Sequence, residues 1–195
     1  MTTFVYLHGF NSTFTPENDK VESLSALGEV VGISYDSYSS YQKIYDHLAT
    51  AISQYDLYDT VVVGTSLGGF WAAVMGSKLS IPSIIINPCY DPTNMLQKHV
   101  GPQQNYATGI KTNFELDSAL SYNNHKLYDL QYRYLPLVLL DMSDDVIDSF
   151  ESKELFKGFP NVQYDGGSHR FDHMEESLPN ISIYLNHCSF IDHVC

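Results

Sequence analysis

The clearest chemical signal in the sequence is a serine flanked by glycines, in the run VVVGTSLGGF at residues 61–70. Gly64 stands two residues before Ser66, and Gly68 stands two residues after it. Glycine at both positions removes side chains that would clash if the serine stood on a sharp, strained turn. Such a turn between a buried strand and a helix exposes the hydroxyl for attack on a carbonyl carbon. We therefore predict that Ser66 is a nucleophile; the alternative is a plain glycine-rich turn.

A serine nucleophile needs a base that accepts its proton, and His169 is the best candidate. It stands in the glycine-containing run YDGGSHRFD, residues 164–172, after the last expected strand. A loop at that point can carry an imidazole to the serine. We expect the remaining histidines to be structural or surface residues, because they lie too early, on expected helices, in a long insertion or near the C-terminus: His8, His47, His99, His125, His173, His187 and His193.

The base in turn needs a carboxylate that fixes its tautomer and stabilises its protonated form. The run LLDMSDDVID, residues 139–148, offers Asp141, Asp144, Asp145 and Asp148. Asp141 still belongs to the expected strand. Asp144 and Asp145 follow the C-terminal end of that strand, where ligands gather in open α/β sheets. We favour Asp144 as the acid, and Asp145 stays open as the alternative.

Ester chemistry also requires hydrogen-bond donors for the negative oxygen of the tetrahedral intermediate. One donor is expected to be the backbone N–H of Leu67, directly after the nucleophile and at the start of a helix. The other is expected in the loop YLHGFNS, residues 6–12, where the backbone N–H of Phe10 is the candidate. A simple turn is the alternative interpretation of that loop.

Short apolar runs alternate with longer amphipathic stretches, and together they must position these residues. The apolar runs predict strands at residues 3–7, 30–35, 60–64, 81–87, 135–141 and, more weakly, 161–164. Their nearly continuous apolar character is typical of parallel strands covered on both faces. Helical patterns occur at residues 16–27, 40–55, 66–78, 150–156 and 175–185. The alternation predicts an α/β fold with an open, mostly parallel sheet of about six strands and helices on both faces.

One polar stretch, residues 89–134, separates two strong strands and is rich in Asn, Gln and Tyr. Connections of this length are usually functional or disordered. We predict a cap with short helices near residues 94–100 and 117–130. No repeat or linker divides the chain, so residues 1–195 are predicted to form a single domain.

Composition and charge exclude several classes of partner. The formal net charge of −13 would repel nucleic acid and anionic membranes. The sequence offers neither a signal peptide nor an apolar segment long enough to span a membrane. Three cysteines argue against a disulfide framework and favour a reducing compartment, so we expect a cytoplasmic protein: Cys89, Cys188 and Cys195.

Two histidine-containing patterns have some of the features of metal sites. His169 and His173 are four residues apart but lack the intervening glutamate of a zinc protease motif. A C-terminal group lacks the paired spacing of a zinc site: His187, Cys188, His193 and Cys195. The sequence also carries no Walker or dinucleotide fingerprint. We therefore expect neither a metal nor a cofactor.

These motifs together resemble the α/β-hydrolase superfamily and, more narrowly, the small bacterial YqiA-like esterases. The matching runs are HGFNS (8–12), GTSLGGF (64–70), IIINPCYDP (84–92), SDDVID (143–148) and GGSH (166–169). The resemblance spans nearly the whole chain and is least in the insertion. Ser143 replaces a glycine of the family and Asp145 replaces a glutamate, which keeps the choice of acid open. The resemblance implies an esterase acting on small acyl esters.

The leading functional hypothesis is therefore hydrolysis of a small carboxylic ester through an acyl-enzyme on Ser66. Thioester hydrolysis or acyl transfer could use the same triad, and the acceptor and the cap would decide between them. A third hypothesis is a non-catalytic binding protein that keeps the fold. The intact set of serine, histidine and aspartate weighs against that last hypothesis.

Overall fold

A computed structural model describes the chain from residue 1 to residue 194, with side chains as far as residue 189. Its centre is a six-stranded sheet in the order β2-β1-β3-β4-β7-β8, and every neighbouring pair is parallel. This confirms the predicted parallel α/β sheet. The strands are β1 (Thr3–Leu7), β2 (Glu29–Ile33), β3 (Thr60–Thr65), β4 (Ser83–Ile86), β7 (Leu137–Asp141) and β8 (Asn161–Tyr164).

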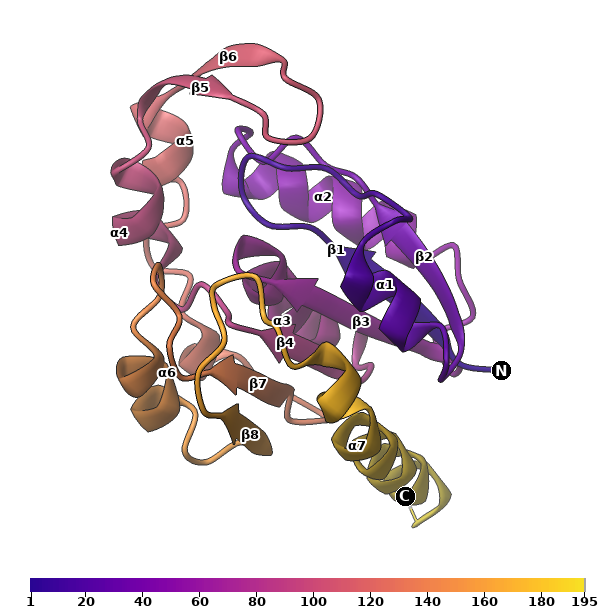
Figure 1. Ribbon diagram of the computed structural model, residues 1–195. Coiled ribbons are helices and arrows are strands. Elements are labelled where there is room, and N and C mark those ends of the chain that lie inside the picture. Colours follow the sequence, from indigo (N-terminus) through magenta and orange to yellow (C-terminus); the bar gives the residue numbers. More distant parts are fainter. Residues whose placement is uncertain (195) are drawn as a thin grey trace.

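Helices cover both faces of this sheet, as its apolar strands require. In β1, Val5 and Leu7 pack into the core with α2 and α3, whereas Phe4 and Tyr6 pack with α1 and α7. Figure 1 shows α1 and α7 together on one side of the sheet. The principal helices are α1 (Asp19–Leu24), α2 (Tyr41–Ile52), α3 (Leu67–Leu79), α6 (Ser149–Leu155) and α7 (Met174–Val194).

Helices α1 and α7 differ most in extent from the prediction. Helix α1 begins at Asp19 rather than near residue 16, because the side chain of Asn18 caps it by accepting the N–H of Lys20 at 3.0 Å. Helix α7 continues past residue 185 to Val194 and contains Pro179. Among the described residues, no helix is both long enough and apolar enough to cross a membrane.

The insertion at residues 89–134 contains a hairpin that the sequence pattern did not predict. Its elements are α4 (Pro92–Gln97), β5 (Gly101–Gln104), β6 (Lys111–Phe114), α5 (Leu116–Leu120) and a 3-10 turn at Leu127–Asp129. The expected helix near 94–100 is present but begins earlier, where the Asp91 side chain caps it. The helix expected near 117–130 is shorter than that range, because α5 ends at Leu120 and only the 3-10 turn follows. Figure 1 shows the antiparallel β5–β6 hairpin reaching from α4 and α5 toward α2.

The strand order creates a switch point between β1 and β3. From β1 the chain passes to β2 on one side, and it returns to form β3 on the other side. The loops that leave the C-terminal ends of β1 and β3 therefore start at a switch point, the usual place for a ligand in such sheets. The first of these loops carries Phe10, and the second carries Ser66.

Candidate active site

Ser66 stands alone between β3 and α3 in a conformation that most residues avoid. Its backbone angles are φ 58° and ψ −121°. A non-glycine residue held in such a region costs on the order of 1–3 kcal/mol, so the surroundings must enforce it. The backbone N–H of Ser66 donates to the carbonyl of Ile86 at 3.0 Å, and its own carbonyl accepts the N–H of Cys89 at 3.0 Å. Both bonds fasten the turn to the end of β4.

The two flanking glycines are required by close backbone contacts. A Cβ atom on Gly64 would lie 2.0 Å from the carbonyl oxygen of Gly68. A Cβ atom on Gly68 would lie 2.1 Å from the carbonyl oxygen of Leu7 at the end of β1. Contacts this short do not occur for real Cβ atoms, and backbone atoms cannot easily move away. The spacing seen in the sequence therefore reflects a strand, a turn and a helix packed without side chains between them.

His169 and Asp144 are brought together by the loops after β8 and β7. Nδ1 of His169 lies 2.8 Å and 3.0 Å from the two carboxylate oxygens of Asp144. The Asp144 side chain is 1% exposed, and its Oδ1 also accepts the backbone N–H groups of Val146 and Ile147 at 2.8 Å and 2.9 Å. These bonds hold the carboxylate in the orientation that an imidazole requires.

Asp145 occupies a different position from its neighbour. Its side chain accepts the backbone N–H of His169 at 3.4 Å, whereas the imidazole ring bonds to Asp144. The residue is exposed, in contrast to the buried carboxylate of Asp144. Of the two aspartates that the sequence left open, Asp144 is therefore the one that contacts the ring.

Asn87, directly after β4, ties the loop of His169 to the turn of Ser66. Its side-chain NH₂ group donates to the carbonyl of Ser168 at 3.0 Å and to that of His169 at 3.4 Å. Asn87 is 1% exposed and has a φ of 40°. Its neighbour Ile86 accepts the backbone N–H of Ser66.

Among the described residues, none hydrogen-bonds to the hydroxyl group of Ser66. Hydrogen bonds between catalytic groups are often long before substrate binds.

The loop after β1 lies against the serine. A Cβ atom on Gly9 would lie 3.5 Å from Cβ of Ser66 and 3.9 Å from its Oγ. His8 is 3% exposed; its Nε2 accepts the N–H of Tyr35 at 3.2 Å, so its Nδ1 carries the proton and donates to the carbonyl of Gly9 at 2.8 Å. Burial lowers the pKa of His8, which keeps the ring neutral and this tautomer in place.

That bond orients the peptide unit between Gly9 and Phe10. In a trans peptide the C=O and N–H groups point in opposite directions. Because the carbonyl of Gly9 turns back to His8, the N–H of Phe10 points the other way. Within the described residues, the backbone N–H groups of Phe10 and Leu67 have no backbone acceptor. Leu67 is the first residue of α3, where unpaired N–H groups and the positive end of the helix dipole coincide.

The insertion packs directly on this loop. The ring of Phe10 lies 5.2 Å from that of Phe114 and 5.3 Å from that of His99, between ring centroids. The hairpin turn adds two hydrogen bonds: Tyr106 N–H to the carbonyl of Asn11 at 2.9 Å, and the Asn105 side chain to the carbonyl of Ser12 at 3.0 Å. The insertion therefore borders the site from the side of the Phe10 loop.

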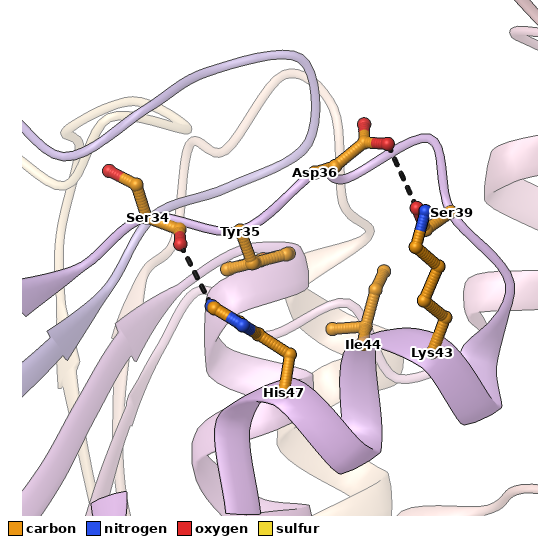
Figure 2. A pocket seen from close by; sticks show the side chains of 7 residues that line it. All are labelled: Ser34, Tyr35, Asp36, Ser39, Lys43, Ile44 and His47. Atoms are coloured by element: carbon orange, nitrogen blue, oxygen red, sulfur yellow. Dashed lines mark hydrogen bonds between the residues drawn. The ribbon is translucent and has the colours of Figure 1, made fainter. Parts of the chain in front are cut away.

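Two of the hollows in the surface of the described residues help to place the site. One, of about 300 Å³, lies against the turn of the acid and is lined by Met142, Asp144, Asp145, Val146, Ile147, Asp148, Ser149 and Phe150. The other, of about 410 Å³, lies between the 34–39 segment and α2 (Figure 2). There His47 contacts the carbonyl of Ser34 at 3.1 Å. Its lining does not include Ser66, Asp144 or His169, so we place no chemistry there.

The histidines and cysteines considered as metal ligands do not assemble a metal site in the described part of the chain. His173 bonds to Asp141 rather than sharing a ligand with His169. No group of three or more suitable ligands is found among the described residues. Cys195 and the side chain of His193 lie outside them. Burial raises the pKa of the Cys89 thiol, so the cysteine next to the site is not a ready nucleophile.

Known proteins support this architecture. Residues 3–186 match an uncharacterised protein family, UPF0227. The chain belongs to the UPF0227 family. A member from Shewanella sp. strain MR-7 is 27% identical over 186 residues, which cover 92% of this chain and 97% of that protein. The resemblance to YqiA-like proteins, drawn from the motifs, is thereby confirmed.

Solved structures share the fold at low sequence identity. Est1E from Butyrivibrio proteoclasticus superposes with a TM-score of 0.73 at 16% identity, covering 95% of this chain and 87% of that one. FphF, a fluorophosphonate-binding serine hydrolase of Staphylococcus aureus, gives a TM-score of 0.63 at 14% identity, covering 94% and 83%. The UPF0227 protein described here therefore has an α/β-hydrolase fold.

Three residues that organise the site were not singled out from the sequence. In the sequence, Asn87 stood out only as part of an Asn-Pro pair after a strand. His8 stood out only as one histidine of an early loop, and Asp141 only as a residue of an expected strand. Each is buried, and each forms at least one hydrogen bond with a segment distant in sequence. The available signal was a polar residue at the C-terminal end of a buried strand, the edge of the sheet where sites form.

Proposed function

We propose that this protein is a serine esterase that hydrolyses small carboxylic esters through an acyl-enzyme on Ser66. The observation that carries the proposal is the 2.8 Å contact between His169 Nδ1 and the buried carboxylate of Asp144. A carboxylate at Nδ1 leaves Nε2 as the atom that takes a proton, and it stabilises the imidazolium that results. The loop of His169 is tied through Asn87 to the strained turn of Ser66.

In the first half of the reaction, Ser66 Oγ attacks the carbonyl carbon while its proton passes to Nε2 of His169. A C–O bond forms, and the carbonyl oxygen becomes negative. The backbone N–H groups of Phe10 and Leu67 donate to that oxygen, aided by the N-terminus of α3. As the intermediate collapses, the bond to the alcohol breaks, and the alcohol leaves with the proton from His169.

In the second half, water replaces the alcohol. His169 accepts a proton from the water as its oxygen attacks the acyl carbon. The same two N–H groups stabilise the second negative oxygen. The bond to Ser66 then breaks, the acid leaves, and the serine recovers its proton from His169. Asp144 keeps one tautomer through both halves, so a single imidazole serves as base and then as acid.

The surroundings of the site favour a small ester without negative charge. The hollow of about 300 Å³ beside the acid turn is lined by the carboxylates of Asp144, Asp145 and Asp148. These carboxylates would repel an anionic acyl or alcohol group. Est1E and FphF share the fold, and FphF is named as a serine hydrolase, which supports hydrolytic chemistry for this chain.

The test compares wild type with Ser66→Ala on p-nitrophenyl esters of increasing acyl length and on a matched thioester. We expect Ser66→Ala to lower kcat at least about 10⁴-fold, as loss of the nucleophile does in serine proteases. Ser77→Ala, on the same helix, is the matched control and should retain activity. Turnover retained by Ser66→Ala would refute the nucleophile. If wild type turns over only the thioester, the protein is a thioesterase. If wild type is inactive on every p-nitrophenyl ester and on the thioester, the result contradicts the proposal and favours a binding protein.

A further inference from the structure

Asp141, the last residue of β7, is a buried carboxylate outside the proposed reaction. Its side chain is 0% exposed. Its Oδ2 accepts the backbone N–H of Ser168 at 3.1 Å and that of Asp172 at 2.7 Å, while its Oδ1 accepts Nδ1–H of His173 at 2.7 Å. One carboxylate therefore holds both ends of the short segment that contains His169.

The segment between those two ends is tightly folded around the carboxylate. The N–H of Phe171 donates to the carbonyl of Ser168 at 2.9 Å, and Phe171 has a φ of 65°. A Cβ atom on Gly167 would lie 1.9 Å from Oδ2 of Asp141, and Gly167 has a φ of 71°. The loop therefore approaches Asp141 so closely that a side chain at residue 167 would clash with the carboxylate.

His173 is the side-chain hydrogen-bond partner of this buried carboxylate, and its protonated form would carry the opposite charge. Its ring stacks on that of Tyr164 in β8, with centroids 5.0 Å apart. The hydrogen bond to Asp141 is the largest cause that raises the pKa of His173, with smaller contributions from the nearby carboxylates of Glu176 in α7 and Asp172. The cation of Lys20 in α1 interacts electrostatically with Asp141 and Asp172, and the cation of Arg170 interacts with Lys20.

We propose that Asp141, paired with His173, is a positioning residue that holds the 168–172 turn so that His169 keeps its contact with Asp144. The proposal rests on the esterase function above, because it concerns how the base of that reaction is held. The two carboxylates near the end of β7 thus have different roles. Asp144 contacts the imidazole of His169, and Asp141 fixes the backbone on both sides of it.

Three variants separate these roles. Asp141→Asn keeps the size of the side chain but turns an NH₂ group toward one of three N–H donors. His173→Gln keeps a neutral donor for Asp141 but cannot take up a proton. Asp165→Asn is the matched control, because it removes an exposed carboxylate from the start of the same loop. Thermal unfolding of each variant establishes that it is folded.

The kinetic readout is kcat and KM on p-nitrophenyl acetate between about pH 6 and 9. Asp141→Asn should lower kcat by about 10–100-fold, the size of effect that follows a displacement of about 1 Å in a catalytic group, with KM within about twofold. For His173→Gln, the wild-type-to-variant ratio of kcat should fall toward one as pH rises through the raised pKa of His173. Asp165→Asn should match wild type throughout.

A second readout does not depend on activity. Amide hydrogen exchange of residues 166–173 should quicken in Asp141→Asn and stay unchanged in Asp165→Asn. Unchanged kcat and unchanged exchange in Asp141→Asn would overturn the proposal. If that variant does not fold, a pH-independent kcat ratio for His173→Gln would overturn it. A wild type without esterase activity would refute the proposed function, while the exchange of this loop would still decide whether Asp141 holds it.

Discussion

Replacing Asp144 by asparagine isolates the role of its charge in an otherwise intact site. Oδ1 of Asp144 accepts the N–H groups of Val146 and Ile147, and Oδ2 is the nearer oxygen to His169 Nδ1, at 2.8 Å. In Asp144→Asn, the amide oxygen is expected to stay at the two backbone N–H groups. The NH₂ group then takes the place of Oδ2 and points toward the imidazole.

That orientation predicts the size of the effect. An N–H directed at Nδ1 of His169 requires a lone pair there, so the ring must carry its proton on Nε2. A protonated Nε2 cannot accept the proton of Ser66. The same substitution at the corresponding aspartate of serine proteases lowers kcat by about 10⁴-fold through the wrong tautomer. We expect a loss of that order here, which corresponds to about 5 kcal/mol of transition-state stabilisation at 1.36 kcal/mol per tenfold.

Asp145→Asn is the matched control for this experiment. The asparagine side chain in this variant would keep an oxygen that can accept the N–H of His169, a bond of 3.4 Å at an exposed position. We expect kcat within about threefold of wild type, the usual range for a surface substitution. The assay is kcat on p-nitrophenyl acetate, with thermal unfolding to establish that both variants are folded. A larger loss for Asp145→Asn than for Asp144→Asn, or an Asp144→Asn variant with wild-type kcat, would refute the reasoning.

Three further predictions concern packing and titration. Gly68→Ala should lower the free energy of unfolding by about 2 kcal/mol or more and abolish turnover, because its Cβ atom would lie 2.1 Å from the carbonyl oxygen of Leu7. A urea titration that gives the wild-type free energy of unfolding for this variant would contradict the prediction. The difference in free energy of unfolding between wild type and His173→Gln, measured between about pH 5.5 and 9, should be largest below about pH 6.5. It should disappear as pH rises through the raised pKa of His173. A difference that grows with pH would be evidence against the pairing of His173 with Asp141. Cys89 is 1% exposed with a raised pKa, so iodoacetamide should label it only in denaturant; rapid labelling of the native protein would contradict its burial.

The sheet could be predicted from the sequence because its strands are buried on both faces. Runs such as TVVVG and LPLVLLD leave little choice of structure, and the parallel order follows from helices between them. The β5–β6 hairpin could not be predicted in this way. Its strands GPQQ and KTNF are largely exposed and polar, and the turn between them bonds to Asn11 and Ser12, which are distant in sequence.

The site could be predicted as a set of residue types but not as a geometry. The spacing around Ser66 and the Gly-Gly pair before His169 named the nucleophile and the base as candidates. The choice between Asp144 and Asp145 depends on which carboxylate turns inward, and the backbone N–H groups of Val146 and Ile147 decide that. The bonds of Asn87 and Asp141 join segments more than 25 residues apart, which no local pattern records.

The most direct test of the account is the site of covalent modification by a fluorophosphonate, a probe that phosphonylates activated serines. Native protein should gain one adduct by intact mass, and peptide mapping should place it on Ser66. Ser66→Ala should gain none, and Asp144→Asn should react far more slowly than wild type. An adduct on another residue, or a wild type that stays unmodified while folded, would contradict the claim that Asp144 and His169 activate Ser66.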